Sequence, residues 1–341
     1  AGTIFAMTAL YSTSKDASLK EKMESAIGYL IKTVKQCPLP YTPTQKAKCV
    51  IDVEGESADK VSRLGTNAMA IIAIIEYIDV VQPSNAMSLL GTAKSIAEFI
   101  EKSQKENGSF VHKIVLDKNA HALSKVDEDL YVKYYQGQVA FALARFTTLA
   151  KEHSWTINHG WADIAYKAAK HVIDSDLPKE EKDFTMDHWI MYGIAELQSA
   201  GHDVTDQFME YAMRSVTVTA KFQNVDIPAK EEKDMMGIFY DDESAVATAV
   251  KAEGVCAAYP LAKTAEQKSL IHDTVERALR YQLQTQFHPE TAMYMRKPSK
   301  VIGGFRSSVI HYDMRNDYVQ HNLLSLLCYE QITTRKSSAK A

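Results

Sequence analysis

Several acidic and histidine side chains of this sequence lie inside otherwise apolar segments, where a charged group needs a specific reason to be present. Asp317 and His321 are spaced i, i+4 and therefore share one face of a helix. A carboxylate in that position could orient the imidazole and fix its tautomer, as a catalytic or metal-binding histidine requires. The alternative is an aspartate in the first turn, stabilised by the helix dipole, beside an ordinary buried histidine.

Glu253 is the most unusual carboxylate, because it lies well inside a segment of Ala, Val and Cys residues. A buried glutamate has a raised pKa, which suits a general acid near neutral pH. The alternative is a structural ion pair with Arg63 or Arg315 from a neighbouring helix. A buried charge is costly when it is unpaired, so Glu253 is expected to be either paired or functional.

Asp187, His188 and Trp189 begin another apolar segment, directly after a charged loop. Asp187 could supply a catalytic carboxylate, or it could simply cap the helix that follows. Trp189 could face a ligand, or it could belong to the core. Further polar residues stand at the starts of other apolar segments, and we treat them as candidate ligand-binding residues: Arg63, Tyr134, Tyr135, Gln136, Arg306, Arg315 and Gln320.

Two kinds of helix are predicted to position these residues. Amphipathic helices, which pack one face and leave the other in water, are predicted at residues 18–36, 84–104, 158–173, 205–222 and 264–286. Helices that are apolar nearly all round are predicted at residues 61–80, 134–150, 187–200, 243–261 and 317–331. The two kinds alternate strictly, and residues 3–10 add one more apolar helix. We therefore expect an all-α fold of about six inner and five outer helices, with an inner ring wrapped by an outer ring.

A weak repeat supports this arrangement. The loops Asn107-Gly-Ser-Phe110, Gly237-Ile-Phe239 and Gly303-Gly-Phe305 each follow an outer helix and precede an inner one. One period of about 65 residues fits all three, if one copy is degenerate, and a fixed period indicates a repeated supersecondary unit. Because successive inner helices would run parallel, their N-terminal ends, and the candidate residues at them, should gather at one rim.

Alternating inner and outer helices with Gly-x-Phe loops resemble the α/α toroid of the six-hairpin glycosidases and of related epimerases, lyases and cyclases. This resemblance implies one α/α toroid over residues 1–341, built of about six hairpins, with short β-hairpins in its loops. It also implies an active site in a central funnel, where the loops lead into the inner helices. Fold analogy provides a prior for function and nothing stronger.

On that resemblance we expect a carbohydrate-active enzyme, a glycoside hydrolase that uses a carboxylate pair drawn from Asp187, Glu253 and Asp317. His321 completes the expected catalytic set, and His188 is expected to bind substrate. The arginines would recognise an acidic group of an oligosaccharide or polysaccharide, and Trp189, Tyr134 and Tyr135 would stack on sugar rings. Tyrosines buried in the core with satisfied hydroxyl groups are the simpler alternative.

Two other functions remain open at this point. A polysaccharide lyase or sugar epimerase on the same fold would use His188, His321 or the tyrosines as base. A toroid that only binds a glycan or a protein would use the same polar rim for recognition. The sequence does not choose between them, and it does not indicate an oligomeric state.

Composition excludes several other classes of protein. The chain has 341 residues, a net charge of −4 and 46% apolar residues, so nucleic acid is not an expected partner. Only 14 Gly and 9 Pro argue against a many-stranded sandwich or barrel. The sequence contains no P-loop, GxGxxG, GxSxG or HExxH motif, and we expect neither a cofactor nor a metal.

The cysteines and the apolar runs bear on the compartment. Cys37 and Cys49 bracket a loop with three prolines, and they could form a disulfide or remain two separate thiols. Cys256 and Cys328 lie in apolar helical segments and are predicted to be small core residues. No run of consecutive apolar residues is long enough to cross a membrane. A removed signal peptide and a cloning boundary explain the start at Ala1 equally well. We expect a periplasmic or secreted protein, with a cytoplasmic one as the alternative.

Overall fold

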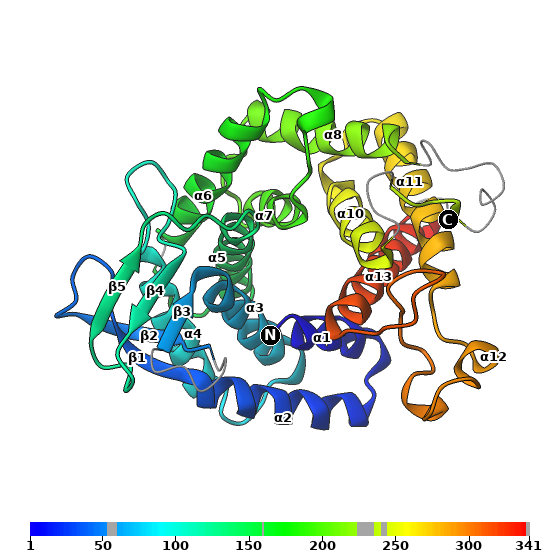
Figure 1. Cartoon of the computed structure of the whole chain (residues 1–341). Helices are drawn as coiled ribbons and strands as arrows, with labels where there is room; N and C mark the ends of the chain where they lie inside the picture. The colour runs from blue at the N-terminus through cyan, green and yellow to red at the C-terminus, as the bar shows by residue number, and fades with distance from the viewer. Residues whose placement is uncertain (53–59, 159, 224–234, 240–243, 339–341) are drawn as a thin grey trace. The chain divides into compact units, whose positions relative to one another are not determined.

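The structure is a computed structural model that describes residues 1–52, 60–158, 160–223, 235–239 and 244–338, with side chains described up to residue 334 (Figure 1). The chain divides into two compact units, which are described one at a time. Unit 1 comprises Ala1–Lys179 and Tyr192–Phe208, and unit 2 comprises Glu180–Met191 and Met209–Ala341. The division passes through α7 (His188–Ser199) and α8 (Asp206–Lys221).

Unit 1 contains the first three predicted pairs of inner and outer helices. These helices are α1 (Gly2–Ser14), α2 (Ala17–Thr33), α3 (Leu64–Val81), α4 (Ala86–Glu101), α5 (Tyr135–Glu152) and α6 (Trp161–Asp176). The inner helix α3 packs against both α1 and α5, while α2 and α4 pack on α3 and α6 packs on α5 (Figure 1). Residues 70–78 of α3 are buried without interruption, as an apolar helix without a polar face requires.

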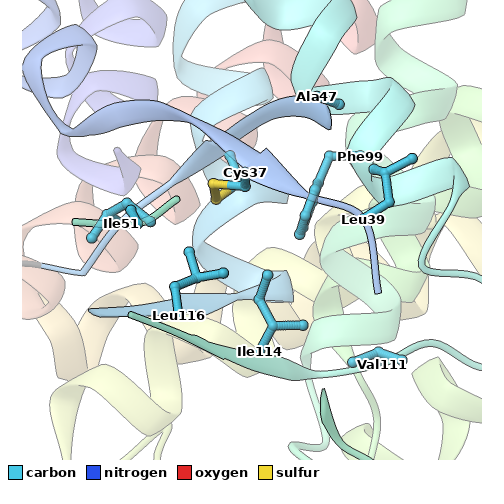
Figure 2. Close-up of a cluster of buried hydrophobic side chains, with 10 residues drawn as sticks. Cys37, Leu39, Ala47, Ile51, Phe99, Val111, Ile114 and Leu116 are labelled. Carbon is cyan, nitrogen blue, oxygen red and sulfur yellow. A yellow bond between two sulfur atoms is a disulfide. The ribbon is translucent and has the colours of Figure 1, made fainter. Parts of the chain in front are cut away.

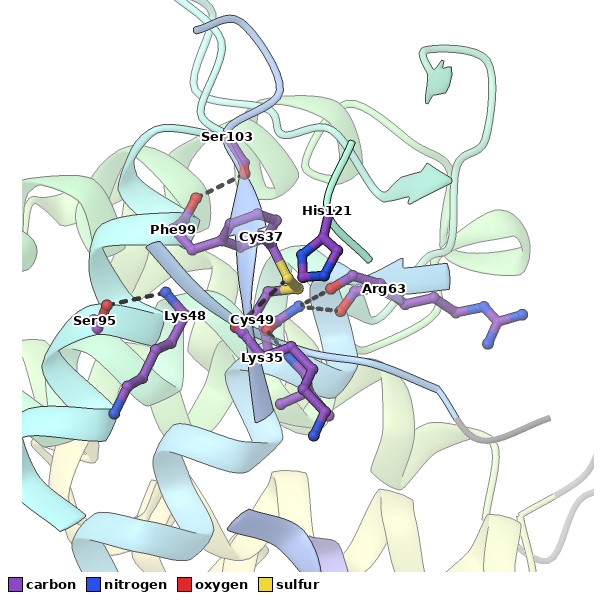
Figure 3. Close-up of a disulfide and its surroundings, with 12 residues drawn as sticks. Lys35, Cys37, Lys48, Cys49, Arg63, Ser95, Phe99, Ser103 and His121 are labelled. Carbon is purple, nitrogen blue, oxygen red and sulfur yellow. Dashed lines mark hydrogen bonds between the residues drawn. A yellow bond between two sulfur atoms is a disulfide. The ribbon is translucent and has the colours of Figure 1, made fainter. Parts of the chain in front are cut away.

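Two small antiparallel sheets occupy the loops of unit 1. Strands β1 (Val34–Pro38) and β2 (Lys46–Val50) form a hairpin, and β3 (Lys60–Arg63), β4 (Lys113–Leu116) and β5 (Leu123–Asp127) form a sheet in that order. A disulfide between Cys37 and Cys49 joins β1 to β2, and the hairpin is fixed to α4 where the Lys48 backbone N–H donates to Ser95 Oγ at 3.0 Å (Figure 3).

The two sheets share one apolar cluster. Leu39 and Ile51 from the first hairpin region, Ile114 and Leu116 from β4, and Phe99 from α4 are all buried in it (Figure 2). The strand residues in this cluster follow the two-residue period of a half-buried strand, since Ile114 and Leu116 point to the same face. The cluster packs the β-structure onto the outer helix α4.

Unit 2 is built around α10 (Ala245–Ala257), α11 (Ala265–Gln284) and α13 (Asn316–Ser338), each of which packs against the other two. A disulfide between Cys256 and Cys328 joins α10 to α13. The prediction that these cysteines are ordinary core residues is therefore wrong with respect to their chemistry, although Cys256 is buried as expected. Their pairing depends on the packing of two helices that are far apart in the sequence.

The Gly-x-Phe repeat corresponds to a repeated structural unit. Phe110, Phe239 and Phe305 each form an isolated antiparallel bridge with a glutamine that follows the preceding outer helix: Gln104, Gln223 and Gln286 respectively. In each case the glutamine Nε2 donates to the carbonyl of the glycine in the loop, Gly108, Gly237 or Gly303. All three glycines have positive φ, which a residue with a side chain adopts only at a cost.

The helix α3 is longer and more apolar than the sequence-based expectation that no segment could span a membrane. By length and composition α3 could cross a bilayer, but 72% of its apolar window is buried inside the protein. That burial is typical of the core helix of a globular fold.

Candidate active site

The centre of the candidate site is a contact between Glu253 of α10 and His321 of α13. Glu253 Oε2 and His321 Nδ1 are 2.5 Å apart. Since an ionised carboxylate can only accept, the imidazole donates its Nδ1–H to Glu253, which leaves Nε2 as the nitrogen available for chemistry. Glu253 is fully buried, and the His321 side chain is 12% exposed. The glutamate therefore orients a histidine whose edge still reaches the surface.

His188, the first residue of α7, completes this cluster. Its ring centroid lies 5.4 Å from that of His321 in an edge-to-face arrangement, and 4.5 Å from the ring of Trp189. Burial, together with the nearby charge of His321, holds the pKa of His188 well below its usual range. His188 is therefore a neutral imidazole at physiological pH.

Asp187 has a local structural role at the start of α7. Its Oδ1 accepts a hydrogen bond from the Trp189 backbone N–H at 2.9 Å, which is the capping interaction of an N-terminal aspartate. Its own backbone N–H donates to the hydroxyl of Tyr211 at 3.4 Å. These contacts fix the first turn of α7 and thus the direction of the His188 side chain.

A glycine permits the close approach of α10 to the start of α7. A Cβ on Gly254 would lie 2.5 Å from Met186 Cε and 3.1 Å from His188 Cα, both closer than ordinary packing allows. Gly254 follows Glu253 directly, so the absence of a side chain there brings the glutamate beside the histidine. Glu253 itself lies in the third turn of α10, deeper in the helix than the predicted position at its N-terminal end.

His188, Glu253 and His321 also form a donor set that could hold a divalent metal ion. One ligand atom from each residue lies within 4.8 Å of the others. Two histidines and one carboxylate are a combination used by Zn²⁺ and by non-haem Fe²⁺. A second such group, His272, Asp273 and Glu276, lies along α11 and is more exposed.

Asp317 does not orient His321. Its two carboxylate oxygens accept hydrogen bonds from Nε and Nη2 of Arg315, at 2.9 and 2.8 Å, in a solvent-exposed ion pair. The interpretation based on the i, i+4 spacing is thus wrong about the partner, which is Glu253 of another helix. Asp317 lies one helical turn before His321 on α13, but the carboxylate that contacts His321 comes from α10.

Arg306 lies in the loop before α13 and is buried. Its Nη2 donates to the carbonyl of Gln284 at 2.8 Å, and its guanidinium lies 4.6 Å from the ring centre of Tyr312. Its Nε and Nη1 are buried and make no hydrogen bond to the described part of the chain. Gln320, in the first turns of α13, is also buried.

The remaining predicted residues belong to unit 1. Arg63 forms an ion pair with Asp52, whose other oxygen accepts from Thr66 Oγ1 at 3.2 Å. Tyr134 is partly exposed and Gln136 is fully buried, with neither side-chain atom of Gln136 bonded to any described residue. These residues surround the starts of α3 and α5.

His112 is a buried histidine near the start of α5 that no sequence pattern singles out. It is buried between the rings of Tyr131 and Tyr135, at centroid distances of 5.3 and 5.5 Å, and its Nδ1 accepts from the Val132 backbone N–H at 2.8 Å. Burial, with smaller contributions from Lys105 and His171, lowers its pKa to about 4. A lone histidine in a strand-like segment provides no sequence signal for this environment.

Comparisons with known proteins identify the fold. No family model matches the sequence, and no curated protein matches it. Among solved structures, a GH76 α-mannanase from Bacteroides thetaiotaomicron matches 98% of this chain and 87% of its own, at 10% identity and a TM-score of 0.59. A cellobiose 2-epimerase from Bacillus thermoamylovorans matches 98% of this chain and 86% of its own, at 13% identity and a TM-score of 0.61. A D-mannose isomerase also matches 98% of this chain and 86% of its own, at 12% identity and a TM-score of 0.60.

The chain has the α/α toroid fold that these solved structures share. The fold class predicted from alternating inner and outer helices, with short β-hairpins in the loops, is therefore confirmed. In this toroid, α7, α10 and α13 are inner helices, and they carry His188, Glu253 and His321. The structures that share the fold include a hydrolase, an epimerase and an isomerase, so the fold does not select a reaction.

Proposed function

We propose that this α/α toroid catalyses proton transfer next to the carbonyl group of a reducing sugar, as an epimerase or aldose–ketose isomerase does. The observation that carries the proposal is the contact between buried Glu253 and His321. A carboxylate that accepts from Nδ1–H fixes the tautomer and the orientation of the imidazole, so that Nε2 is the nitrogen that can take a proton. His321 is therefore equipped to act as a base.

In this proposal the reaction proceeds on the open-chain sugar. His321 Nε2 removes the proton from the carbon beside the carbonyl. The electron pair of that C–H bond forms a C=C bond while the carbonyl π electrons move onto the carbonyl oxygen, which gives an enediolate. Return of a proton to the same carbon from the opposite face restores the carbonyl and gives the epimer. Return of the proton to the former carbonyl carbon, with the proton of the neighbouring hydroxyl passing to the former carbonyl oxygen, gives the ketose. Neutral His188, whose ring faces His321, is the second group that can carry a proton.

Glycoside hydrolysis by a carboxylate pair has weaker support in the geometry. A glycosidase needs one carboxyl group to protonate the leaving oxygen and a second to attack or to activate water. Glu253 binds His321, Asp187 caps α7, and Asp317 is paired with Arg315 at the surface. All three candidate carboxylates thus already have other partners, whereas the two histidines have the arrangement that proton transfer needs.

The test is incubation of the purified protein with reducing sugars in D2O, followed by NMR. Mannose, glucose and cellobiose are suitable substrates, since proton exchange at C2 reports both epimerisation and isomerisation, even when little product accumulates. Fructose, whose C2 is the carbonyl carbon, is followed by proton exchange at C1. Enzyme-dependent deuterium incorporation that is lost in His321→Asn and retained in His272→Asn would support the proposal. The α11 histidine serves as the control because it lies outside the Glu253–His321 pair.

Other outcomes would replace the proposal with one of its alternatives. New reducing ends from mannan without C2 exchange would indicate a hydrolase. Ultraviolet absorbance from a new double bond would indicate a lyase. Sugar binding by calorimetry, with no turnover of any substrate, would indicate a glycan-binding toroid.

We also propose that the protein works in an oxidising compartment, as the expected periplasmic or secreted location implies. The two disulfides, Cys37–Cys49 and Cys256–Cys328, support this, because disulfides are rare in reducing cytosol. Trapping free thiols in the protein from its native host, with an alkylating reagent at the moment of lysis, tests the proposal. Four alkylated cysteines would overturn it.

A further inference from the structure

The disulfide of unit 2 links the same two helices that carry the Glu253–His321 pair. On α10, Cys256 follows Glu253 by three residues, and on α13, Cys328 follows His321 by seven. Both spacings return to the same face of a helix, after one turn and two turns respectively. The covalent bond and the hydrogen bond therefore join the same faces of α10 and α13.

Several of the buried residues of α10, the helix that the Cys256–Cys328 disulfide joins to α13, are small. The buried residues of α10 include Ala245, Ala249 and Ala252, together with Gly254. Small side chains form shallow ridges, so they fix the register of a helix against its neighbours less firmly than large interlocking ones do. α10 has 13 residues, and any shift along its axis would carry Glu253 with it.

We propose that the Cys256–Cys328 disulfide is a positioning device for the acid–base pair, and that its reduction uncouples Glu253 from His321. Each cysteine is a positioning residue, since it acts through its neighbour on the same helix. Reduction by a dithiol proceeds by exchange: the S–S bond breaks, two thiols form on Cys256 and Cys328, and the dithiol is oxidised to its disulfide. The expected effect on catalysis rests on the proposed function, but the effect on the hydrogen bond does not.

A small displacement is enough to matter at this site. The Glu253–His321 contact is short, at 2.5 Å, and Glu253 is fully buried, so no water can replace the carboxylate as partner without rearrangement. A misplacement of about 1 Å at a reacting group can cost on the order of 100-fold in rate. Substrate contacts made by other residues would be affected less, so kcat should respond more than KM.

The experiment compares two double variants, Cys256→Ala with Cys328→Ala and Cys37→Ala with Cys49→Ala. The second is a matched control, because it removes the disulfide of unit 1 and leaves α10 and α13 untouched. The first readout is the NMR resonance of the His321 Nδ1 proton, assigned by its loss in His321→Asn. The second is kcat and KM for the sugar found in the D2O assay, measured well below the unfolding temperature of each variant.

We expect the Nδ1 resonance to weaken or disappear in the Cys256/Cys328 variant and to persist in the control. We also expect kcat to fall at least tenfold with less than a threefold change in KM, whereas the control keeps wild-type values. A folded Cys256/Cys328 variant that retains both the resonance and kcat would overturn the proposal.

The wild-type protein provides a second test if the double variant does not fold. Titration with a dithiol reductant, with alkylation and mass spectrometry to count reduced cysteines, should show the Nδ1 resonance declining as Cys256 and Cys328 become reduced. A resonance that survives their full reduction in folded protein would again overturn the proposal. If the wild type turns over no sugar, the proposed function fails, but the NMR result still decides the positioning role.

Discussion

His188, at the start of α7, and His321 of α13 meet edge to face within unit 2, with ring centroids 5.4 Å apart. Two imidazolium ions at that distance would repel each other, and His188 is also buried. His188 therefore stays neutral, whereas the ring of His321 is held at Nδ1 by the buried Glu253. This asymmetry is what a pair of proton-transfer groups requires, because one must donate while the other accepts.

Glu253→Gln is expected to reduce kcat by about 100-fold, at the lower end of what a positioned general base contributes. The amide can still bond to the imidazole, but it cannot stabilise the imidazolium. Steady-state kinetics with the sugar identified in the D2O assay provides the measurement. Asp317→Asn is the matched control, since it removes a carboxylate that pairs with Arg315 at the surface. Equal losses in both variants would contradict the assignment of Glu253 as the partner of His321.

Gly254→Ala should destabilise the protein by about 1–3 kcal/mol, the usual cost of overpacking. The new Cβ would press on Met186 and on the backbone of His188, and we expect a loss of activity larger than the loss of folded protein. Urea denaturation and kinetics provide both measurements.

Gly91→Ala on α4 is the control for this substitution, because a Cβ there meets nothing within 4 Å. Replacing a helical glycine by alanine in open space should stabilise the protein by about 0.5–1 kcal/mol. The interpretation of Gly254 fails if both substitutions shift the urea midpoint in the same direction.

Acid should destabilise the protein in part through His112. Its pKa is about 4 in the folded state, below its ordinary value of 6.5, so the unfolded state binds the proton more tightly. This cost is absent above about pH 7 and grows as the pH falls through 6.5 towards 4. Between pH 7 and pH 5 the free energy of unfolding should fall by about 2 kcal/mol from this group alone.

The contribution of His112 is isolated by His112→Gln, which retains a polar side chain that can accept from Val132 and does not titrate. Urea denaturation of both proteins at pH 7 and pH 5 should show a smaller decrease in the variant. An identical decrease would mean that His112 is not a source of the acid sensitivity. His188 has a lowered pKa as well, so part of the decrease should persist in the variant.

The two disulfides should differ in their contribution to stability. In the chain-entropy account, a cross-link stabilises by restricting the unfolded chain, and more so for a longer loop. The separations are 72 residues for Cys256–Cys328 and 12 for Cys37–Cys49. Removal should therefore cost about 4 kcal/mol and about 3 kcal/mol respectively. Chemical denaturation of the two double variants measures these values, and the reverse order would show that strain or residual structure outweighs loop length.

The sequence by itself determined the architecture. Runs such as residues 68–78, apolar on every side, can be satisfied only by burial all round, and their alternation with amphipathic helices leaves few arrangements. The repeat of Gly-x-Phe loops could be recognised in the sequence because each loop needs a glycine at positive φ, which is a local property of the backbone. Local propensity and period are written in neighbouring residues, so these features could be predicted.

The sequence also singled out His188, Glu253 and His321, because charged and polar groups in apolar segments are conspicuous. Only the tertiary structure decided their partners. Asp317 shares a helix face with His321, yet Glu253 holds it, and Cys256 pairs with Cys328 across 72 positions. These contacts depend on the register between α10 and α13 and on the close approach of α10 to the start of α7 at Gly254. No periodicity in a single chain encodes that register, and therefore the chemistry of the site emerged only once the helices were packed.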